Sequence, residues 1–113
     1  MYLGLDLSTQ SFSAVLLDEQ GQLQAQHGIN FGERLPQYNA PSGFVHGEQA
    51  GEVFSDVRMW LEALDLLLSE FSQQVDLSQV KAISGSAQQH ATVWLNGSFA
   101  TSLARLSGES SLK

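Results

Sequence analysis

Cysteine is absent from this chain of 113 residues, long apolar runs are missing, and there are only two prolines. Without cysteine, neither a disulfide framework nor a thiolate metal site can form, which suits a cytoplasmic protein. No run of about 18 apolar residues is present, so we expect no transmembrane helix and no membrane partner. The chain opens on a strand-like pattern, without the basic and apolar segments of a secretory signal.

Basic residues are also scarce: five Lys and Arg face twelve Asp and Glu, giving a formal charge of −7. This field repels a phosphate backbone, so nucleic acid is not expected as a partner. A nucleotide is an anion as well. The chain could hold one only through backbone N–H groups, hydroxyls and a metal ion rather than a lysine cluster.

The apolar residues, 42% of the chain, follow the pattern of a small α/β domain. Alternation over residues 2–8, 12–18 and 22–31 predicts three strands in an antiparallel meander. Between the second and third strands, Asp18 and Gly21 indicate a tight turn. Residues 32–51 contain both prolines and four glycines, which predicts a long loop.

From residue 52 the apolar period lengthens to three and four, which predicts a helix over 52–72 with Trp60 and Phe71 in the core. Strands are expected at 77–84 and 91–95, with Trp94 in the core or in a pocket wall. Residues 102–113 begin with a short helical pattern and continue with Gly, Ser and Glu. A meander followed by a crossover helix predicts a mixed sheet with packed helices. No apolar element closes the pattern, so we expect the front part of a longer protein.

Asp6 lies inside the first apolar strand and is followed by Ser8 and Thr9. An acid in a strand about to be buried is costly unless it is paired, solvated in a cleft or bound to a cation. One interpretation is a hairpin whose N–H groups and hydroxyls hold phosphate while Asp6 positions Mg²⁺ through water. The alternative is a solvent-facing acid before an ordinary turn.

Gln88, Gln89 and His90 follow a buried strand, where open α/β sheets present ligands. Amides and imidazole both donate and accept hydrogen bonds, which suits the reading of hydroxyl groups. The alternative is an exposed polar loop. In the long loop, residues 43–46 place Phe44 and His46 ahead of the helix, either as a pocket lining or as a loop anchor.

Taken in order, these segments resemble the N-terminal domain of the FGGY family of carbohydrate kinases, and its xylulokinase branch in particular. Four stretches carry the resemblance: LGLDLSTQSFSAVLLDEQG at 3–21, SGFVHGEQAGEVF at 42–54, MWLEALDLLL at 59–68 and VKAISGSAQQHATVW at 80–94. The resemblance implies an actin-like, ribonuclease H-like α/β fold. It also implies ATP-dependent phosphorylation of a ketose, with D-xylulose as the expected sugar and Mg²⁺ as the cofactor.

The resemblance also implies roles for individual residues. Asp6 would position the metal and the phosphoryl group, and Ser8, Thr9 and Gln10 would contact phosphate. The residues expected to bind the sugar are Gln88, Gln89, His90, Phe44 and His46. In this interpretation the whole chain, 1–113, divides into a meander with the phosphate hairpin (1–31), a pocket loop (32–51), a helix (52–72) and strands with the sugar loop (79–95).

Two positions depart from the family pattern: Ser13 stands where many members carry a basic residue, and Ala91 where glycine is common. The family's catalytic base and adenine-binding domain lie farther downstream, so we expect this chain alone to be inactive as a kinase. Three alternatives stay open: another ketose or polyol kinase such as a ribulokinase or glycerol kinase, a non-catalytic actin-like binding module, and a chaperone-type ATPase. Exposed apolar surface could also support a homodimer.

Overall fold

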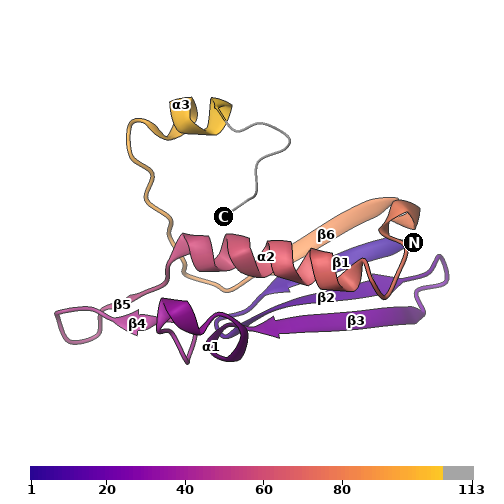
Figure 1. Cartoon of the computed structure of the whole chain (residues 1–113), viewed down its shortest axis with the longest axis horizontal. Helices are drawn as coiled ribbons and strands as arrows, with labels where there is room; N and C mark the ends of the chain where they lie inside the picture. The colour runs from indigo at the N-terminus through magenta and orange to yellow at the C-terminus, as the bar shows by residue number, and fades with distance from the viewer. Residues whose placement is uncertain (106–113) are drawn as a thin grey trace.

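A mixed four-stranded sheet with one long helix lying across it forms the body of the protein (Figure 1). The computed structural model describes residues 1–105. The strands are β1 (Tyr2–Leu7), β2 (Ser11–Leu17), β3 (Leu23–Asn30) and β6 (Ala82–Ala87), and their order across the sheet is β3-β2-β1-β6. β1 pairs antiparallel with β2, β2 pairs antiparallel with β3, and β6 runs parallel to β1.

The predicted meander is present, and its turn has the predicted chemistry. In β2 the residues Phe12, Ala14 and Leu16 are buried while their neighbours are half-buried, which is the period-two pattern of a strand. At the following turn, the backbone N–H groups of residues 20 and 22 donate to Asp18 Oδ1 at 2.9 and 2.8 Å. Gly21 takes a φ of +77°, which an L side chain rarely adopts.

Helix α2 (Val57–Phe71) buries one stripe of side chains on β2 and β3. Its fully buried residues recur at every fourth position: Met59, Ala63, Leu67 and Phe71. Trp60 is only half-buried, so the prediction that it belongs to the core holds in part. The helix starts five residues later than predicted, because Asp56 caps it by accepting from the Arg58 N–H at 2.9 Å.

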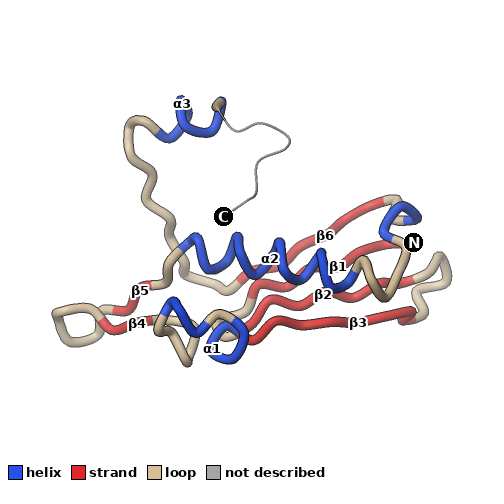
Figure 2. Tube along the Cα trace, viewed as in Figure 1, coloured by secondary structure: helices blue, strands red, loops and turns tan. Residues whose placement is uncertain are grey.

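The stretch before α2 is more structured than a loop. It contains the short helix α1 (Phe31–Arg34), the 3-10 turn η1 (Pro36–Tyr38), and a hairpin of β4 (Val45–His46) with β5 (Val53–Phe54). This hairpin projects from one end of the sheet (Figure 2).

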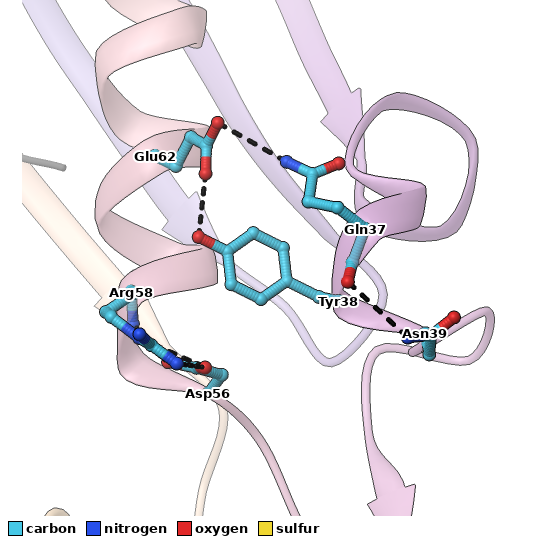
Figure 3. A network of polar contacts seen from close by, with 6 residues as sticks. All are labelled: Gln37, Tyr38, Asn39, Asp56, Arg58 and Glu62. Atoms are coloured by element: carbon cyan, nitrogen blue, oxygen red, sulfur yellow. Dashed lines mark hydrogen bonds and ion pairs between the residues drawn. The ribbon is translucent and has the colours of Figure 1, made fainter.

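A polar cluster fastens η1 to the first turns of α2 (Figure 3). The Tyr38 hydroxyl donates to Glu62 Oε2 at 2.7 Å, and Gln37 Nε2 donates to the other oxygen of that carboxylate at 3.3 Å. The carboxylate raises the pKa of Tyr38 to about 12, since a hydrogen bond from the neutral phenol favours the protonated form.

Two predicted elements near the C-terminal end need correction. The strand predicted at 77–84 is observed as the 3-10 turn η2 (Leu77–Gln79) followed by β6. The strand predicted at 91–95 is wrong: residues 91–96 have no regular structure, because no described strand lies beside them to complete a ladder. Trp94 is 91% exposed, so its prediction as core or pocket wall is wrong too.

Beyond that segment, α3 (Phe99–Ala104) stands away from the body (Figure 1). It overlaps the beginning of the short helix expected at 102–113, and most of that stretch lies outside the described residues. The mixed sheet with its crossover helix confirms the predicted α/β class. Across residues 1–105, no helix is both long and apolar enough to cross a membrane.

Candidate functional site

A cleft of about 370 Å³ opens where the β1–β2 turn, the end of β6 and the start of α2 meet. Its apolar lining consists of Phe44, Val53, Phe54, Val57, Trp60, Ala91 and Val93. Its polar lining consists of Thr9, Ser55, Gln88, Gln89, His90 and Thr92. An apolar wall facing a few polar groups is the usual composition of a small-molecule site.

A hydrogen bond between Thr9 and Gln88 connects the residues predicted to contact phosphate with those predicted to bind the sugar. The Thr9 hydroxyl donates to Gln88 Oε1 at 3.1 Å, although the two residues are 79 positions apart in the sequence. The backbone N–H of Gln88 also donates to the carbonyl of Leu7 at 2.8 Å. This meeting follows from topology, since β1 and β6 are parallel neighbours whose carboxyl ends share one edge.

The turn after β6 brings Gln89 and His90 to the cleft, and both are exposed there. His90 has a φ of +61°, in the left-handed region that costs a non-glycine residue about 1–2 kcal/mol. Such backbone strain is often concentrated at ligand sites. The turn therefore presents the imidazole at the cleft at an energetic cost.

The loop before β4 is seated directly on the β1–β2 turn. Gly43 has a φ of +87°, and a Cβ there would lie 1.7 Å from the carbonyl oxygen of Thr9, so only glycine fits. The Ser55 hydroxyl donates to the Gly43 carbonyl at 2.8 Å. This seat places Phe44 in the cleft wall. His46 does not line the cleft; its ring meets the Phe44 ring edge-to-face at 5.5 Å.

Asp6 lies outside this cleft and is exposed, so the premise of an acid about to be buried is incorrect. Its side chain belongs to the sheet face opposite α2, in a shallow hollow of about 290 Å³ that Ser13 and Ser86 also line. Asp6 Oδ2 accepts from the Ser8 hydroxyl at 2.6 Å, and Oδ1 accepts from Ser86.

Those two hydrogen bonds, that of Ser8 first and that of Ser86 second, lower the pKa of Asp6 and keep it ionised. Ser13, which stands where many family members carry a basic residue, lines the same hollow. No lysine or arginine lines it. Gln10 is exposed, and its backbone carbonyl accepts from the Phe31 N–H at 2.9 Å.

No metal cage is formed by the described residues: nowhere in 1–105 do three or more His, Cys, Asp or Glu side chains gather. Mg²⁺ at phosphoryl-transfer sites is nevertheless held by one or two carboxylates together with substrate phosphates and water. Asp6 is ionised and is oriented by two hydroxyls, so it could serve as such a carboxylate ligand.

The sequence alone did not reveal Phe54, Ser55 and Trp60 as part of the cleft. The predicted helix includes Phe54, which lies on β5 in the structure. Helical spacing assigns Trp60 to the core, because it does not tell which flank of an apolar stripe faces a pocket. The indole Nε1 of Trp60 is buried and has no hydrogen-bond partner among the described residues. Such an unpaired donor signals an environment other than plain core.

Residues 1–101 match the model of the N-terminal domain of the FGGY family of carbohydrate kinases. The whole chain is 42% identical to a xylulose kinase of Schizosaccharomyces pombe over 113 residues and 36% identical to xylulose kinase 2 of Arabidopsis thaliana over 115 residues. A xylulose kinase of Mus musculus is 36% identical over 107 residues. The chain spans about one fifth of the length of these relatives, 20%, 21% and 19% respectively.

The fold is also shared with a solved structure. A ligand-bound xylulose kinase from Lactobacillus acidophilus superposes with a TM-score of 0.58 at 21% identity, over 79% of this chain and 16% of that chain. At this identity the likeness concerns the fold alone, and it agrees with the expected actin-like architecture. From the family match over residues 1–101, the chain belongs to the FGGY family of carbohydrate kinases and corresponds to its N-terminal domain.

Proposed function

We propose that this chain forms the sugar-side wall of an ATP-dependent ketose kinase that converts D-xylulose to D-xylulose 5-phosphate. The relatives named xylulose kinases support the substrate, and the amides and imidazole at the cleft support a ligand rich in hydroxyls. The proposal depends most on the Thr9–Gln88 hydrogen bond, because it connects the hairpin expected to hold phosphate with the cleft expected to hold the sugar.

In this proposal each residue has a limited task. His90 and Gln89 bond hydroxyls of the sugar, Gln88 keeps the turn in place, and Phe44 shields one side from water. The hydroxyls and N–H groups of the β1–β2 turn hold phosphate oxygens of ATP. Mg²⁺, held by Asp6, would neutralise charge on the transferring phosphoryl group. The resemblance implies a catalytic base in the part of the relatives that this chain does not cover, so we expect only background ADP formation from it.

A second candidate, a non-catalytic module that binds sugar without nucleotide, has one observation in its favour. The hollow beside Asp6 contains Ser13 instead of a basic residue, and no lysine or arginine lines it. Such a module would bind the sugar equally well with and without ATP and Mg²⁺.

Titration calorimetry of D-xylulose into the chain tests the proposed function. Replacing His90 by Ala, or by Gly to relieve the positive φ, should weaken binding by about 5- to 150-fold, the worth of one hydrogen bond to a polar group of about 1–3 kcal/mol. His46→Ala is the matched control, since His46 lies in the same region without lining the cleft. Equal binding by the His90 variants and the control would contradict the proposal.

A further inference from the structure

We propose that the indole N–H of Trp60 donates a hydrogen bond to an oxygen of the acceptor sugar, which makes Trp60 a specificity-determining residue of the cleft. The inference rests on the proposed function, because it assumes that the cleft binds the sugar. It adds a donor on helix α2 to a site otherwise supplied by the β1–β2 turn and the turn after β6.

The observation behind it is an unpaired polar atom. Trp60 Nε1 is closed to solvent and has no acceptor within residues 1–105, and it is the one buried side-chain polar atom there in that condition. Buried tryptophan N–H groups normally have a partner, since an unpaired donor loses its hydration without compensation. Because Trp60 also lines the cleft, a ligand bound there is the candidate acceptor for this donor.

The position of Trp60 fits that use. It lies in the first turn of α2 and lines the cleft together with Phe54 and Val57, and the turn that carries Gln89 and His90 lines the same cleft. Its ring supplies apolar contact while its nitrogen supplies a directional group. The cleft thus offers polar contacts from more than one of its walls.

The chemistry of the partner follows from the donor. An indole nitrogen only donates, so the group that pairs with it must present an acceptor oxygen, such as a sugar hydroxyl or carbonyl. Because the nitrogen is closed to solvent, the side chains over it must shift when that oxygen arrives. A site with such a donor rejects an analogue that lacks the oxygen, because the donor is then left unpaired.

The indole proton can be observed directly. The chain contains two tryptophans, and Trp94 is 91% exposed and outside the cleft, so Trp94→Phe leaves Trp60 as the single reporter. In a proton–nitrogen NMR spectrum of this variant, saturating D-xylulose should move the indole signal downfield and slow its exchange with water. In the matched Trp60→Phe chain, the signal of Trp94 should stay unchanged.

Calorimetry supplies the second measurement. Trp60→Phe keeps an aromatic ring but removes the donor, and D-xylulose affinity should fall by about 3- to 10-fold. If the native chain binds D-xylulose, an unmoved Trp60 signal or an unaltered affinity of Trp60→Phe overturns this inference alone. If the native chain binds no D-xylulose, the proposed function fails first. Should Trp60→Phe fail to fold by circular dichroism, the NMR titration of Trp94→Phe decides.

Discussion

Gly43 and Gly51 allow the effect of a positive φ to be separated from the effect of a close backbone contact. Both have a φ of +87°, but a Cβ at Gly43 would overlap the Thr9 carbonyl oxygen at 1.7 Å, while a Cβ at Gly51 would meet nothing within 4 Å. The two positions therefore share the backbone strain of a substitution and differ only in the close approach.

We expect Gly51→Ala to reduce the free energy of unfolding by about 1–2 kcal/mol, the cost of a positive φ for an L side chain. Gly43→Ala should cost more than twice as much, because the loop must also lift off the β1–β2 turn. Urea denaturation followed by circular dichroism measures both. Equal losses for the two variants would show that the loop is not seated on Thr9.

Glu70 stands at the centre of a charged cluster that the sequence did not disclose. Its Oε2 lies 2.7 Å from His27 Nε2 and accepts from Arg34 Nη1 at 3.2 Å, and its other oxygen accepts from Arg34 Nη2. Arg34 first and His27 second lower the pKa of Glu70 to about 2. No sequence spacing predicts the contact of His27 with Glu70, because the two residues are 43 positions apart.

This cluster predicts a particular acid response. A carboxyl whose folded pKa of about 2 lies below its ordinary 4.5 stabilises the fold above pH 4.5 and loses that contribution as the pH falls through about 2. Glu70→Gln should therefore lower the melting temperature at pH 6, with a deficit that shrinks between pH 5 and pH 2. Thermal melts of the exposed control Glu48→Gln should run parallel to those of the native chain. A deficit that is constant with pH would contradict the prediction.

At the scale of elements, the strands of the meander and the crossover helix could be predicted, because the spacing of apolar residues within each segment is enough to identify it. Other boundaries depend on distant partners. Val53 and Phe54 continue the apolar pattern of the helix, but they pair with β4 instead, and Asp56 then sets the start of α2. The alternation at 91–95 is that of a strand, yet a strand needs a neighbour, and none lies beside it in the described chain.

The candidate site was predictable to a similar extent. Thr9, Gln88 and His90 were each predictable as candidates because they follow strand ends, whereas their meeting at one edge depends on the parallel pairing of β1 with β6. Trp60 could not be assigned, because the orientation of α2 about its own axis is decided by its packing on the sheet. Phe54 could not be assigned, because its place on β5 depends on pairing with β4. The position of Asp6 on the opposite face follows from strand alternation, but which face α2 covers is a tertiary fact.

Docking of η1 on α2 can be tested through Tyr38. Its pKa of about 12 predicts that the phenol stays protonated in the folded chain at pH 11, where an ordinary tyrosine with a pKa near 10 is mostly ionised. The chain has two tyrosines, so Tyr2→Phe isolates the signal. Tyrosinate absorbance at pH 11 should be low in this variant and rise when urea unfolds it. A folded-state midpoint near 10 would rule out the Tyr38–Glu62 contact.

The molecule as a whole is less compact than its length suggests. Its radius of gyration is 15.9 Å, against about 13 Å for a globular domain of roughly 100 residues. The segment after β6 carries much of the exposed apolar surface, with Trp94 at 91%, Leu95 at 58% and Leu103 at 53%. Exposed apolar patches of this kind promote association.

We therefore expect concentration-dependent self-association of this chain through this segment. Trp94→Ser should shift the chain toward monomer in sedimentation velocity at matched concentrations. Leu23→Ser is the control, because Leu23 is 55% exposed at the start of β3, in a different part of the sequence. An equal effect of both substitutions would indicate non-specific association, and an effect of neither would exclude the segment as the contact.

Thr9 contacts both Gly43 and Gln88, and this has a consequence for a longer protein that contains this domain. Its carbonyl oxygen lies close against Gly43 and its hydroxyl donates to Gln88, so we expect a displacement of the β1–β2 turn to be transmitted to two walls of the cleft at once. Thermodynamic linkage makes such communication symmetric. A phosphate ligand that tightens sugar binding by some factor must itself be bound more tightly, by the same factor, once the sugar is present.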